Sequence, residues 1–335
     1  MSGAEQNRQW KLRARPTGMV SRENFEFVTS PVPSPADGEA LVAVEYASLD
    51  PAMRGWLNDA KSYVPPVGIG EVMRAIGVGR VVASKDPALA AGDYVTGMTG
   101  VQSFTVAPAK TWTKIDPSLV PAPRWLGIVG MPGMTAYFGL FDVGAAKAGE
   151  TLVVSAAAGA VGAVVGQLGK IHGMRVVGIA GGSDKCRYLV DELGFDAAID
   201  YKSDDVRAKL REHAPQGIDV YFDNVGGDIL DVALGQLRRH ARVVICGAVS
   251  QYNNAGPPVG PKNYLSLLVN RARMEGFVVF DFAARYAEAA MKIAGWHKAG
   301  KLKAKEDIAE GIEHFPEALG KLFRGENFGK LVLKI

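Results

Sequence analysis

A short segment rich in glycine and alanine is the first part of this sequence that suggests chemistry. Residues 156–162 read AAAGAVG and directly follow the apolar pentapeptide TLVVS. Gly159 would let the backbone approach a phosphate closely, and Gly162 would let a helix pack against a sheet. The helix would offer free N–H groups and a positive dipole end to an anion. The segment is a variant of the dinucleotide-binding fingerprint, with Ala157 in place of the first glycine. A tight strand-to-helix turn without a ligand is the alternative interpretation.

The next strand favours one nicotinamide cofactor over the other. It ends in GIAGGS at positions 178–183, without the carboxylate that NAD-specific proteins place on the ribose 2′-hydroxyl. Lys185 follows shortly, and a lysine supplies a positive charge to the 2′-phosphate of NADP. Asp184 also lies close, but its place suits the N-cap of the next helix. The segment therefore favours NADPH, with Lys185 as a solvated surface charge as the alternative.

Metal ligands are scarce in the first third of the chain. The histidines are His172, His213, His240, His297 and His314, and the cysteines are Cys186 and Cys246. Dehydrogenases hold a catalytic zinc with Cys, His and carboxylate ligands, so we expect no metal site here. Hydrogen bonds would then polarise a carbonyl substrate. Two cysteines are too few for a disulfide framework and predict free thiols in a reducing compartment.

The pattern of apolar residues divides the chain into two domains. Residues 1–126 show short strands among many prolines and glycines, which indicates a compact, loop-rich barrel. From residue 127 to 299, short apolar strands alternate with helical periodicity, which predicts an α/β domain with a doubly wound parallel sheet. We expect residues 300–335 to rejoin the first domain. The expected strands are 40–46, 75–82, 94–96, 151–155, 175–179, 197–199, 219–222, 243–245 and 331–335, and a helix is expected over 184–193.

Length and composition fit a two-domain enzyme. The chain has 335 residues, 48% of them hydrophobic, and a net charge of only +3. Scattered charges of this balance argue against a nucleic-acid groove or a polybasic membrane anchor. Residues 1–18 contain no apolar signal-peptide core, and the longest apolar stretch, residues 156–165, is too short for a membrane span. We therefore expect a cytoplasmic protein.

Several separate segments resemble one family of reductases in order and spacing. They are SLDPAMR at 48–54, YVPP at 63–66, GMPGMTAY at 130–137, AAAGAVG at 156–162, YFDNVGG at 221–227, CGAVSQYN at 246–253 and NFGK at 327–330. Together they resemble the zinc-independent medium-chain dehydrogenases/reductases of the prostaglandin reductase, alkenal double-bond reductase and curcumin reductase family. The resemblance covers essentially the whole chain. It implies a GroES-like catalytic domain (1–126 and 300–335), a Rossmann NADPH-binding domain (127–299) and a homodimer.

The resemblance also implies the residues that contact the cofactor. Those matching the pyrophosphate loop are Gly159, Ala160, Val161 and Gly162. Lys185 and Tyr201 match the pair that flanks the 2′-phosphate, and Asn224 matches a residue near the nicotinamide ribose. The other implied cofactor contacts are Cys246, Gly247, Ala248, Val249, Ser250, Tyr252, Phe277, Val278, Val279 and Asn327. The segment GMTG at 97–100 is less typical of the family, so the substrate stays open. Candidate substrate contacts are Tyr63, Met98 and Phe280, with packing as the alternative.

The reaction implied by the resemblance is the reduction of a conjugated carbon–carbon double bond. NADPH would give hydride to the β-carbon of an enal or enone, and hydrogen-bond donors would stabilise the enolate oxygen. We assign Tyr252 as the catalytic donor, beside the ribose 2′-hydroxyl, because a tyrosine stays protonated at neutral pH. The alternative for Tyr252 is ribose binding alone. Alternatives for the protein are an NADPH quinone oxidoreductase, disfavoured by the block 247–253, and a non-catalytic NADPH-binding sensor, disfavoured by Tyr252 and Asn327.

Overall fold

The computed structural model describes residues 6–335 and divides the chain into two compact units. Unit 1 comprises Met1–Leu126 together with Glu306–Ile335, and unit 2 comprises Gly127–Lys305. The second boundary therefore lies after Lys305 and not after Ala299, where the change in sequence pattern places it. The reason is that Lys303 is tied to unit 2. Its backbone N–H and C=O bond the amide group of Gln167 at 2.7 and 3.0 Å.

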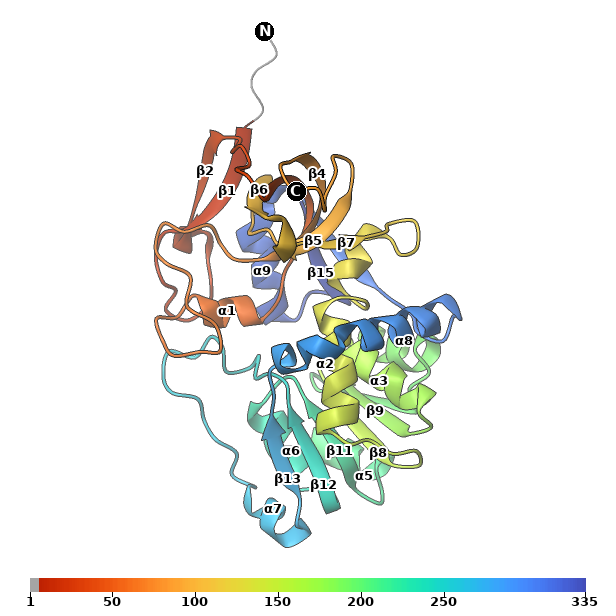
Figure 1. The fold of residues 1–335 in the computed structure, drawn as a ribbon. Helices are drawn as coiled ribbons and strands as arrows, with labels where there is room; N and C mark the ends of the chain where they lie inside the picture. The colour runs from red at the N-terminus through yellow and green to blue at the C-terminus, as the bar shows by residue number, and fades with distance from the viewer. Residues whose placement is uncertain (1–5) are drawn as a thin grey trace. The chain divides into compact units, whose positions relative to one another are not determined.

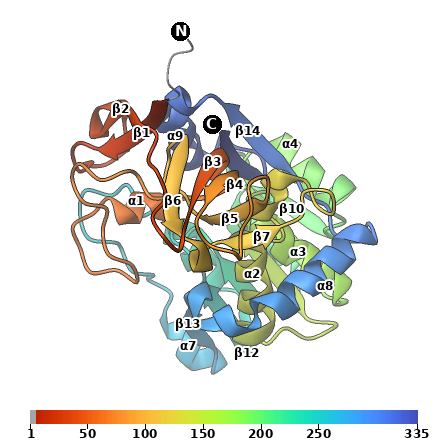
Figure 2. The ribbon, with the colours of Figure 1, turned by 45° about the horizontal axis from the view of Figure 1, so that its top comes forward.

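Unit 1 contains a seven-stranded sheet that joins both ends of the chain, with β3, β4, β5 and β6 visible in Figure 2. Six strands follow the order β14-β15-β3-β4-β5-β7, and β6 pairs with β3. Their bounds are β3 Glu39–Ser48, β4 Ile76–Ser84, β5 Tyr94–Met98, β6 Phe104–Pro108, β7 Thr113–Ile115, β14 Glu306–Glu310 and β15 Lys330–Lys334. All pairs are antiparallel except β14 with β15. The sheet is thus the β-rich, GroES-like domain that the family resemblance implies.

The core of unit 1 is built by segments from both chain ends. A separate hairpin of β1 (Gln6–Leu12) and β2 (Phe25–Pro31) carries Trp10 and Phe25, which pack against Phe315. The indole N–H of Trp10 donates to the carbonyl of Ile312 at 2.7 Å. The helices of this unit are α1 (Ala52–Trp56) and α9 (Phe315–Arg324). The last thirty residues are therefore part of this domain's core, because they supply one side of it.

Unit 2 is a six-stranded parallel sheet in the order β10-β9-β8-β11-β12-β13. The strands are β8 Thr151–Ser155, β9 Arg175–Ala180, β10 Ala197–Asp200, β11 Ile218–Asp223, β12 Leu237–Ile245 and β13 Arg273–Gly276. The helices are α2 Met131–Phe138, α3 Gly162–Ile171, α4 Ser183–Arg187, α5 Val206–His213, α6 Gly227–Leu234, α7 Leu265–Asn270 and α8 Tyr286–Lys298. Figure 1 shows α3 beside β8 and β9 of this sheet. This is the doubly wound Rossmann architecture.

The chain enters the sheet of unit 2 in the middle, and this fixes where a ligand can bind. It starts at β8, continues outward through β9 and β10, and then returns to β11 on the other side of β8. The strand order reverses between β8 and β11, where the connections diverge and leave a crevice at the carboxyl ends. Because all six strands are parallel, the segments that follow them lie at this same edge.

Helix α4 of unit 2 begins differently from the sequence prediction. It was expected over 184–193 with Asp184 as its N-cap, but it begins at Ser183 and its N-cap is Gly182, with φ +99°. Asp184 instead lies in the first turn and pairs with Arg187. The N-cap prediction is therefore wrong, since the pair of glycines completes the turn without a side-chain cap. The helix continues as a π-helical turn, Tyr188–Glu192, before Gly194.

Among the described residues, every helix is too short or too polar to cross a lipid bilayer.

Candidate functional site at the carboxyl edge of the parallel sheet

The glycine-rich turn between β8 and α3 is held in a strained, close-packed shape. Ala156 has φ +47°, a left-handed conformation that residues with a β-carbon rarely adopt. A β-carbon on Gly162 would lie 2.4 Å from the carbonyl oxygen of Ala156 and 2.9 Å from the Cα of Ala157. Both neighbours are backbone atoms, so only glycine fits there. Gly159 donates its N–H to the carbonyl of Ala156 at 2.9 Å.

The departure from the dinucleotide fingerprint at Ala157 has a structural compensation. Ala157 is fully buried, and its β-carbon points at Gly178 in the neighbouring strand β9. A β-carbon on Gly178 would lie 2.9 Å from that of Ala157. Alanine is accommodated at this position because strand β9 has no side chain opposite it. The glycine-rich turn therefore keeps its compact shape despite the missing glycine.

Lys185 and Tyr201 follow the neighbouring strands β9 and β10. Lys185 lies in the first turn of α4, three residues after the glycine pair that follows β9. The backbone N–H of Tyr201 donates to the carbonyl of Ala180 at 3.1 Å. The Tyr201 ring covers Gly181, where a β-carbon would lie 2.8 Å from the ring. The edge of the sheet thus presents an exposed aromatic ring beside the tip of β9.

A buried carboxylate, Asp223, organises the crevice between β8 and β11. It is completely buried, and its Oδ1 accepts hydrogen bonds from the hydroxyls of Ser155 at 2.9 Å and Tyr221 at 3.1 Å. The same oxygen accepts the backbone N–H groups of Val225 and Gly226, each at 3.1 Å. Burial raises the pKa of Asp223 and raises that of Tyr221 well above its usual value. These bonds hold the ends of β8 and β11 together.

Sequence reasoning gave no role to Ser155, Tyr221 or Asp223. Tyr221 and Asp223 lie in the quoted motif YFDNVGG, and a polar residue at the end of an apolar strand was the signal available. The pairing itself joins residues 68 positions apart, and a sequence pattern does not encode it.

Asn224 is fixed in the same crevice by two hydrogen bonds to Ser155. Its backbone N–H donates to the Ser155 hydroxyl and its side-chain Nδ2 donates to the Ser155 carbonyl, both at 2.8 Å. Within residues 6–335, no hydrogen bond reaches the amide oxygen of Asn224. That oxygen is therefore an oriented acceptor, suited to a hydroxyl or amide donor of a ligand.

The loop after β12 is tied to the same crevice by its backbone. The N–H groups of Cys246 and Gly247 donate to the carbonyl of Asp223 at 2.9 and 3.1 Å. The Ser250 hydroxyl donates to the carbonyl of Val225 at 2.6 Å, and Val249 bonds the carbonyl of Asn224 at 3.2 Å. Burial, with a smaller contribution from Asp223, raises the pKa of the Cys246 thiol to about 12. This thiol is thus neutral at physiological pH.

Tyr252 folds back onto the loop that carries it. Its hydroxyl oxygen accepts the backbone N–H of Ala248 at 3.1 Å. A β-carbon on Gly247 would lie 3.1 Å from the same oxygen, so the absence of a side chain there leaves room for the phenol. The bond uses a lone pair of the hydroxyl and not its proton. The hydroxyl is thereby held against the backbone of residues 247 and 248.

The segment after β13 also lies at this edge. The ring of Phe277 lies next to Gly139, where a β-carbon would come within 2.7 Å of the rings of both Phe277 and Phe222. Val279 is buried, whereas the side chain of Phe280 is 43% exposed. The structure thus brings the cofactor residues assigned in unit 2 to one edge of one sheet.

The remaining assigned residues lie in unit 1, and their approach to the cofactor stays a prediction. Asn327 precedes β15, and its Nδ2 donates to the carbonyl of Gly329 at 3.1 Å. The side chains of Tyr63 and Met98 are 54% and 52% exposed. Side chains this exposed contribute little to the core.

Two motifs of unit 1 that are far apart in the sequence meet at a buried ion pair. The ammonium of Lys330 is 3% exposed and donates to Asp50 at 2.7 Å and to the carbonyl of Leu49 at 2.8 Å. Asp50 also accepts the hydroxyl of Ser48. This ion pair therefore links the segments 48–54 and 327–330, and it positions the turn that carries Asn327.

Within residues 6–335, no three His, Cys, Asp or Glu side chains are grouped closely enough to hold a metal ion. His314 belongs to unit 1 through the C-terminal segment. Its side chain is 61% exposed, and its nearest carboxylate is Glu313 at 3.8 Å.

Comparisons with known proteins agree with this architecture. A family model described as the N-terminal domain of oxidoreductase matches residues 8–115, and one described as zinc-binding dehydrogenase matches residues 160–295. The NADPH-dependent curcumin reductase of Escherichia coli is 42% identical over 99% of this chain and 97% of its own length. The NADP-dependent 2-alkenal reductase of Nicotiana tabacum is 41% identical over 98% of this chain and 97% of its own.

A solved structure extends this likeness to the whole fold. The crystal structure of CurA from Vibrio vulnificus in complex with NADPH has a TM-score of 0.93, with 43% identity over 98% of both chains. The fold and the sheet-edge site define an oxidoreductase with one Rossmann and one GroES-like domain. The chain belongs to the medium-chain dehydrogenase/reductase family that contains the prostaglandin, alkenal and curcumin reductases.

Proposed function

We propose that this protein uses NADPH to reduce the carbon–carbon double bond of α,β-unsaturated aldehydes and ketones. The observation that carries the proposal is the gathering of the phosphate loop, Asn224 and the loop of Tyr252 at the reversal point of the sheet. Relatives at 41–43% identity are named for NADPH or NADP and for alkenal or curcumin reduction, and one was solved with NADPH.

The residues at the sheet edge fit a dinucleotide. The turn before α3 excludes side chains at Gly162, so a pyrophosphate can approach its backbone. The amide oxygen of Asn224 can accept a hydrogen bond from a ribose hydroxyl or from the carboxamide of the nicotinamide. Lys185 and Tyr201 stand where a 2′-phosphate and adenine are expected.

The proposed chemistry requires little of the protein beyond orientation and one donor. Bound NADPH supplies the hydride for the β-carbon of the substrate. Tyr252 donates a hydrogen bond to the carbonyl oxygen, where negative charge develops, and so lowers the barrier. The enolate then takes up a proton at its α-carbon, from water or through Tyr252, which gives the saturated carbonyl. We propose that no catalytic zinc takes part, since the described residues offer no cluster of ligands for one.

The first experiment is a substrate panel followed by the consumption of NADPH. The panel contains a 2-alkenal, an aryl enone, a 15-oxo-prostaglandin and a quinone, with NADH as the control cofactor. We expect turnover of the enal and enones, with the saturated carbonyl identified by mass spectrometry. Turnover of the quinone alone would replace this proposal with a quinone oxidoreductase. Binding of NADPH without turnover of any compound would indicate a sensor.

The role of Tyr252 has its own test. Tyr252→Phe is expected to lower kcat about a hundredfold, as removal of an oxyanion donor does in other enzymes. The dissociation constant for NADPH, measured by fluorescence titration, is expected to change much less because the ring remains. Tyr264→Phe, at an exposed position just before α7, is the matched control. A wild-type kcat in Tyr252→Phe would show that the hydroxyl only contacts the cofactor.

A further inference from the structure

The turn after β10 places a second lysine at the tip of β9. The Cε atom of Lys202 lies 3.0 Å from the place that a β-carbon on Gly181 would occupy. The aliphatic chain of Lys202 therefore crosses Gly181, the same glycine that the ring of Tyr201 covers at 2.8 Å. The ammonium group is one bond beyond Cε. It thus lies close to the glycine pair that separates β9 from α4.

The positive charge of Lys202 has no partner at contact distance in the structure. Across residues 6–335, its ammonium makes no hydrogen bond and no ion pair, although its backbone N–H donates to Asp200 at 3.0 Å. Nearby charges are paired differently, since Arg187 is bound to Asp184 within the same helix. Lys202 does act on Asp200 through space, since it is one of the smaller causes of the lowered pKa of that carboxylate, but its ammonium is not held in an ion pair.

The acidic residues of this turn are occupied by backbone N–H groups. The carboxylate of Asp200 accepts the N–H of Gly182 at 2.7 Å, and this bond is the largest cause of its lowered pKa. Asp204 accepts the backbone N–H of Asp200 at 2.9 Å. These carboxylates stabilise the turn by backbone bonds, and Lys202 is available to an external anion.

We propose that Lys202 is a specificity-determining residue that binds the 2′-phosphate of NADPH together with Lys185 and Tyr201. The inference rests on the proposed use of NADPH and deepens it. Three features converge at one glycine: an aromatic ring, an alkyl chain that ends in a cation, and the absence of a side chain. A phosphate dianion at this tip would meet two lysines that follow neighbouring strands.

The test isolates the phosphate by using a probe without nicotinamide. Binding of 2′,5′-ADP and of 5′-AMP is measured by calorimetry, and binding of NADPH and NADH by fluorescence. Because Lys202 is exposed, Lys202→Ala is expected to weaken 2′,5′-ADP and NADPH by about five- to tenfold, and less at high salt. The affinity for 5′-AMP and NADH is expected to stay within about twofold. Lys202→Arg should retain most of the affinity, since the charge is kept.

Matched variants separate this role from a general effect of charge. Lys209→Ala removes a lysine of α5 that is paired with Glu212 at 2.8 Å, and it should change no affinity. Gly181→Ala would displace both Tyr201 and Lys202 from the tip of β9. In the Gly181→Ala background, Lys202→Ala should weaken the binding of 2′,5′-ADP clearly less than it does in the wild type, because the two changes act on one contact.

Two failures are distinguishable. If the wild type binds 2′,5′-ADP no more tightly than 5′-AMP, the proposed preference for NADPH and the role of Lys202 are both overturned. If the wild type prefers 2′,5′-ADP and Lys185→Ala loses that preference while Lys202→Ala keeps it, only the inference about Lys202 is overturned.

Discussion

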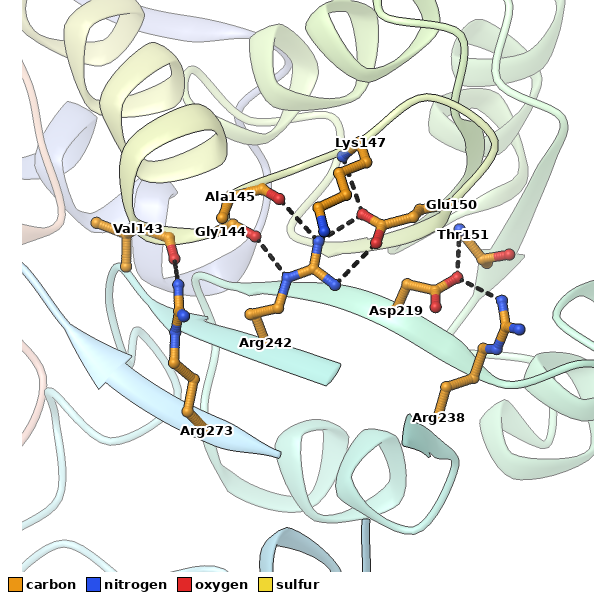
Figure 3. A network of polar contacts seen from close by, with 10 residues as sticks. All are labelled: Val143, Gly144, Ala145, Lys147, Glu150, Thr151, Asp219, Arg238, Arg242 and Arg273. Atoms are coloured by element: carbon orange, nitrogen blue, oxygen red, sulfur yellow. Dashed lines mark hydrogen bonds and ion pairs between the residues drawn. The ribbon is translucent and has the colours of Figure 1, made fainter. Parts of the chain in front are cut away.

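The two edges of the parallel sheet in unit 2 differ in how their polar groups are satisfied. At the amino edge, arginines bond carbonyls and carboxylates of the protein itself, as Figure 3 shows. Arg242 donates to the carbonyls of Gly144 and Ala145 at 2.8 and 3.0 Å and pairs with Glu150. At the carboxyl edge, the buried carboxylate Asp223 has hydroxyl and backbone donors but no cation. The first edge is closed by its own side chains, whereas at the second the amide oxygen of Asn224 accepts no hydrogen bond from the described residues.

Two further arginines extend the amino-edge network. Arg273 donates to the carbonyl of Val143 at 2.5 Å, and Arg238 bonds Asp219 at 3.0 Å. Asp219 in turn accepts the backbone N–H of Thr151 at 2.9 Å. The amino ends of β8, β11 and β13 are thus each fastened by a charged side chain.

Helix polarity explains why the two edges differ. In a parallel α/β sheet, helices begin at the carboxyl edge, where their free N–H groups favour anions. They end at the amino edge, where their last carbonyls lack partners. Val143, Gly144 and Ala145 end or follow the π-helical turn Gly139–Val143, and arginines satisfy their carbonyls. The same arrangement of dipoles therefore yields a structural edge and a binding edge.

The largest expected effect is on stability, at the amino edge. Arg242→Ala removes the partner of Glu150, whose side chain is only 18% exposed, and leaves two carbonyls unbonded. We expect a loss of about 3 kcal/mol in the free energy of unfolding, measured by urea denaturation. The affinity for NADPH should remain unchanged. Arg239→Ala, on the same strand but exposed, is the control. A large loss of affinity in Arg242→Ala at unchanged stability would contradict the contrast between the edges.

A smaller stability effect, with a large binding effect, is expected at the carboxyl edge. Gly162→Ala places a β-carbon against the backbone of residues 156 and 157, which must shift at a cost of about 2 kcal/mol. Because the phosphate loop moves, the affinity for NADPH is expected to fall by roughly tenfold or more. Gly295→Ala is the control, since nothing lies within 4 Å of the added carbon in α8. If Gly162→Ala binds NADPH as tightly as the wild type, this loop is not part of the cofactor site.

The smallest expected effect is a pH dependence at Asp223. Burial raises the pKa of Asp223 in the folded protein. As the pH increases from about 4, the unfolded chain therefore loses this proton before the folded chain does. This residue's contribution to stability is thus greatest at acid pH and declines up to the folded-state pKa. Asp223→Asn cannot ionise, and its stability should therefore improve relative to the wild type over that range. Denaturation at several pH values measures this, with exposed Asp228→Asn as the baseline. A constant difference would contradict the raised pKa.

Much of the local structure was predictable because short-range patterns encode it. Strand β8 has the predicted bounds, 151–155, since three apolar residues between Thr151 and Ser155 lie between a turn and a glycine-rich segment. The fold class was confirmed for the same reason, as apolar strands alternate with helical periodicity. The N-cap assignment of Asp184 failed because Gly182 takes the required backbone conformation without a side-chain bond. Local propensity alone did not distinguish these two ways to begin a helix.

The sequence by itself determined that a parallel α/β domain exists, that a glycine-rich turn follows its first strand, and that no carboxylate ends the second strand. Only the tertiary structure decided that Ser155 meets Asp223, that Gly178 makes room for Ala157, and that Lys202 crosses Gly181. It also decided that residues up to Lys305 remain with unit 2. The physical reason is that apolar periodicity records which residues are buried, whereas contacts between strands depend on their order in the sheet. That order is set by packing among elements far apart in the chain.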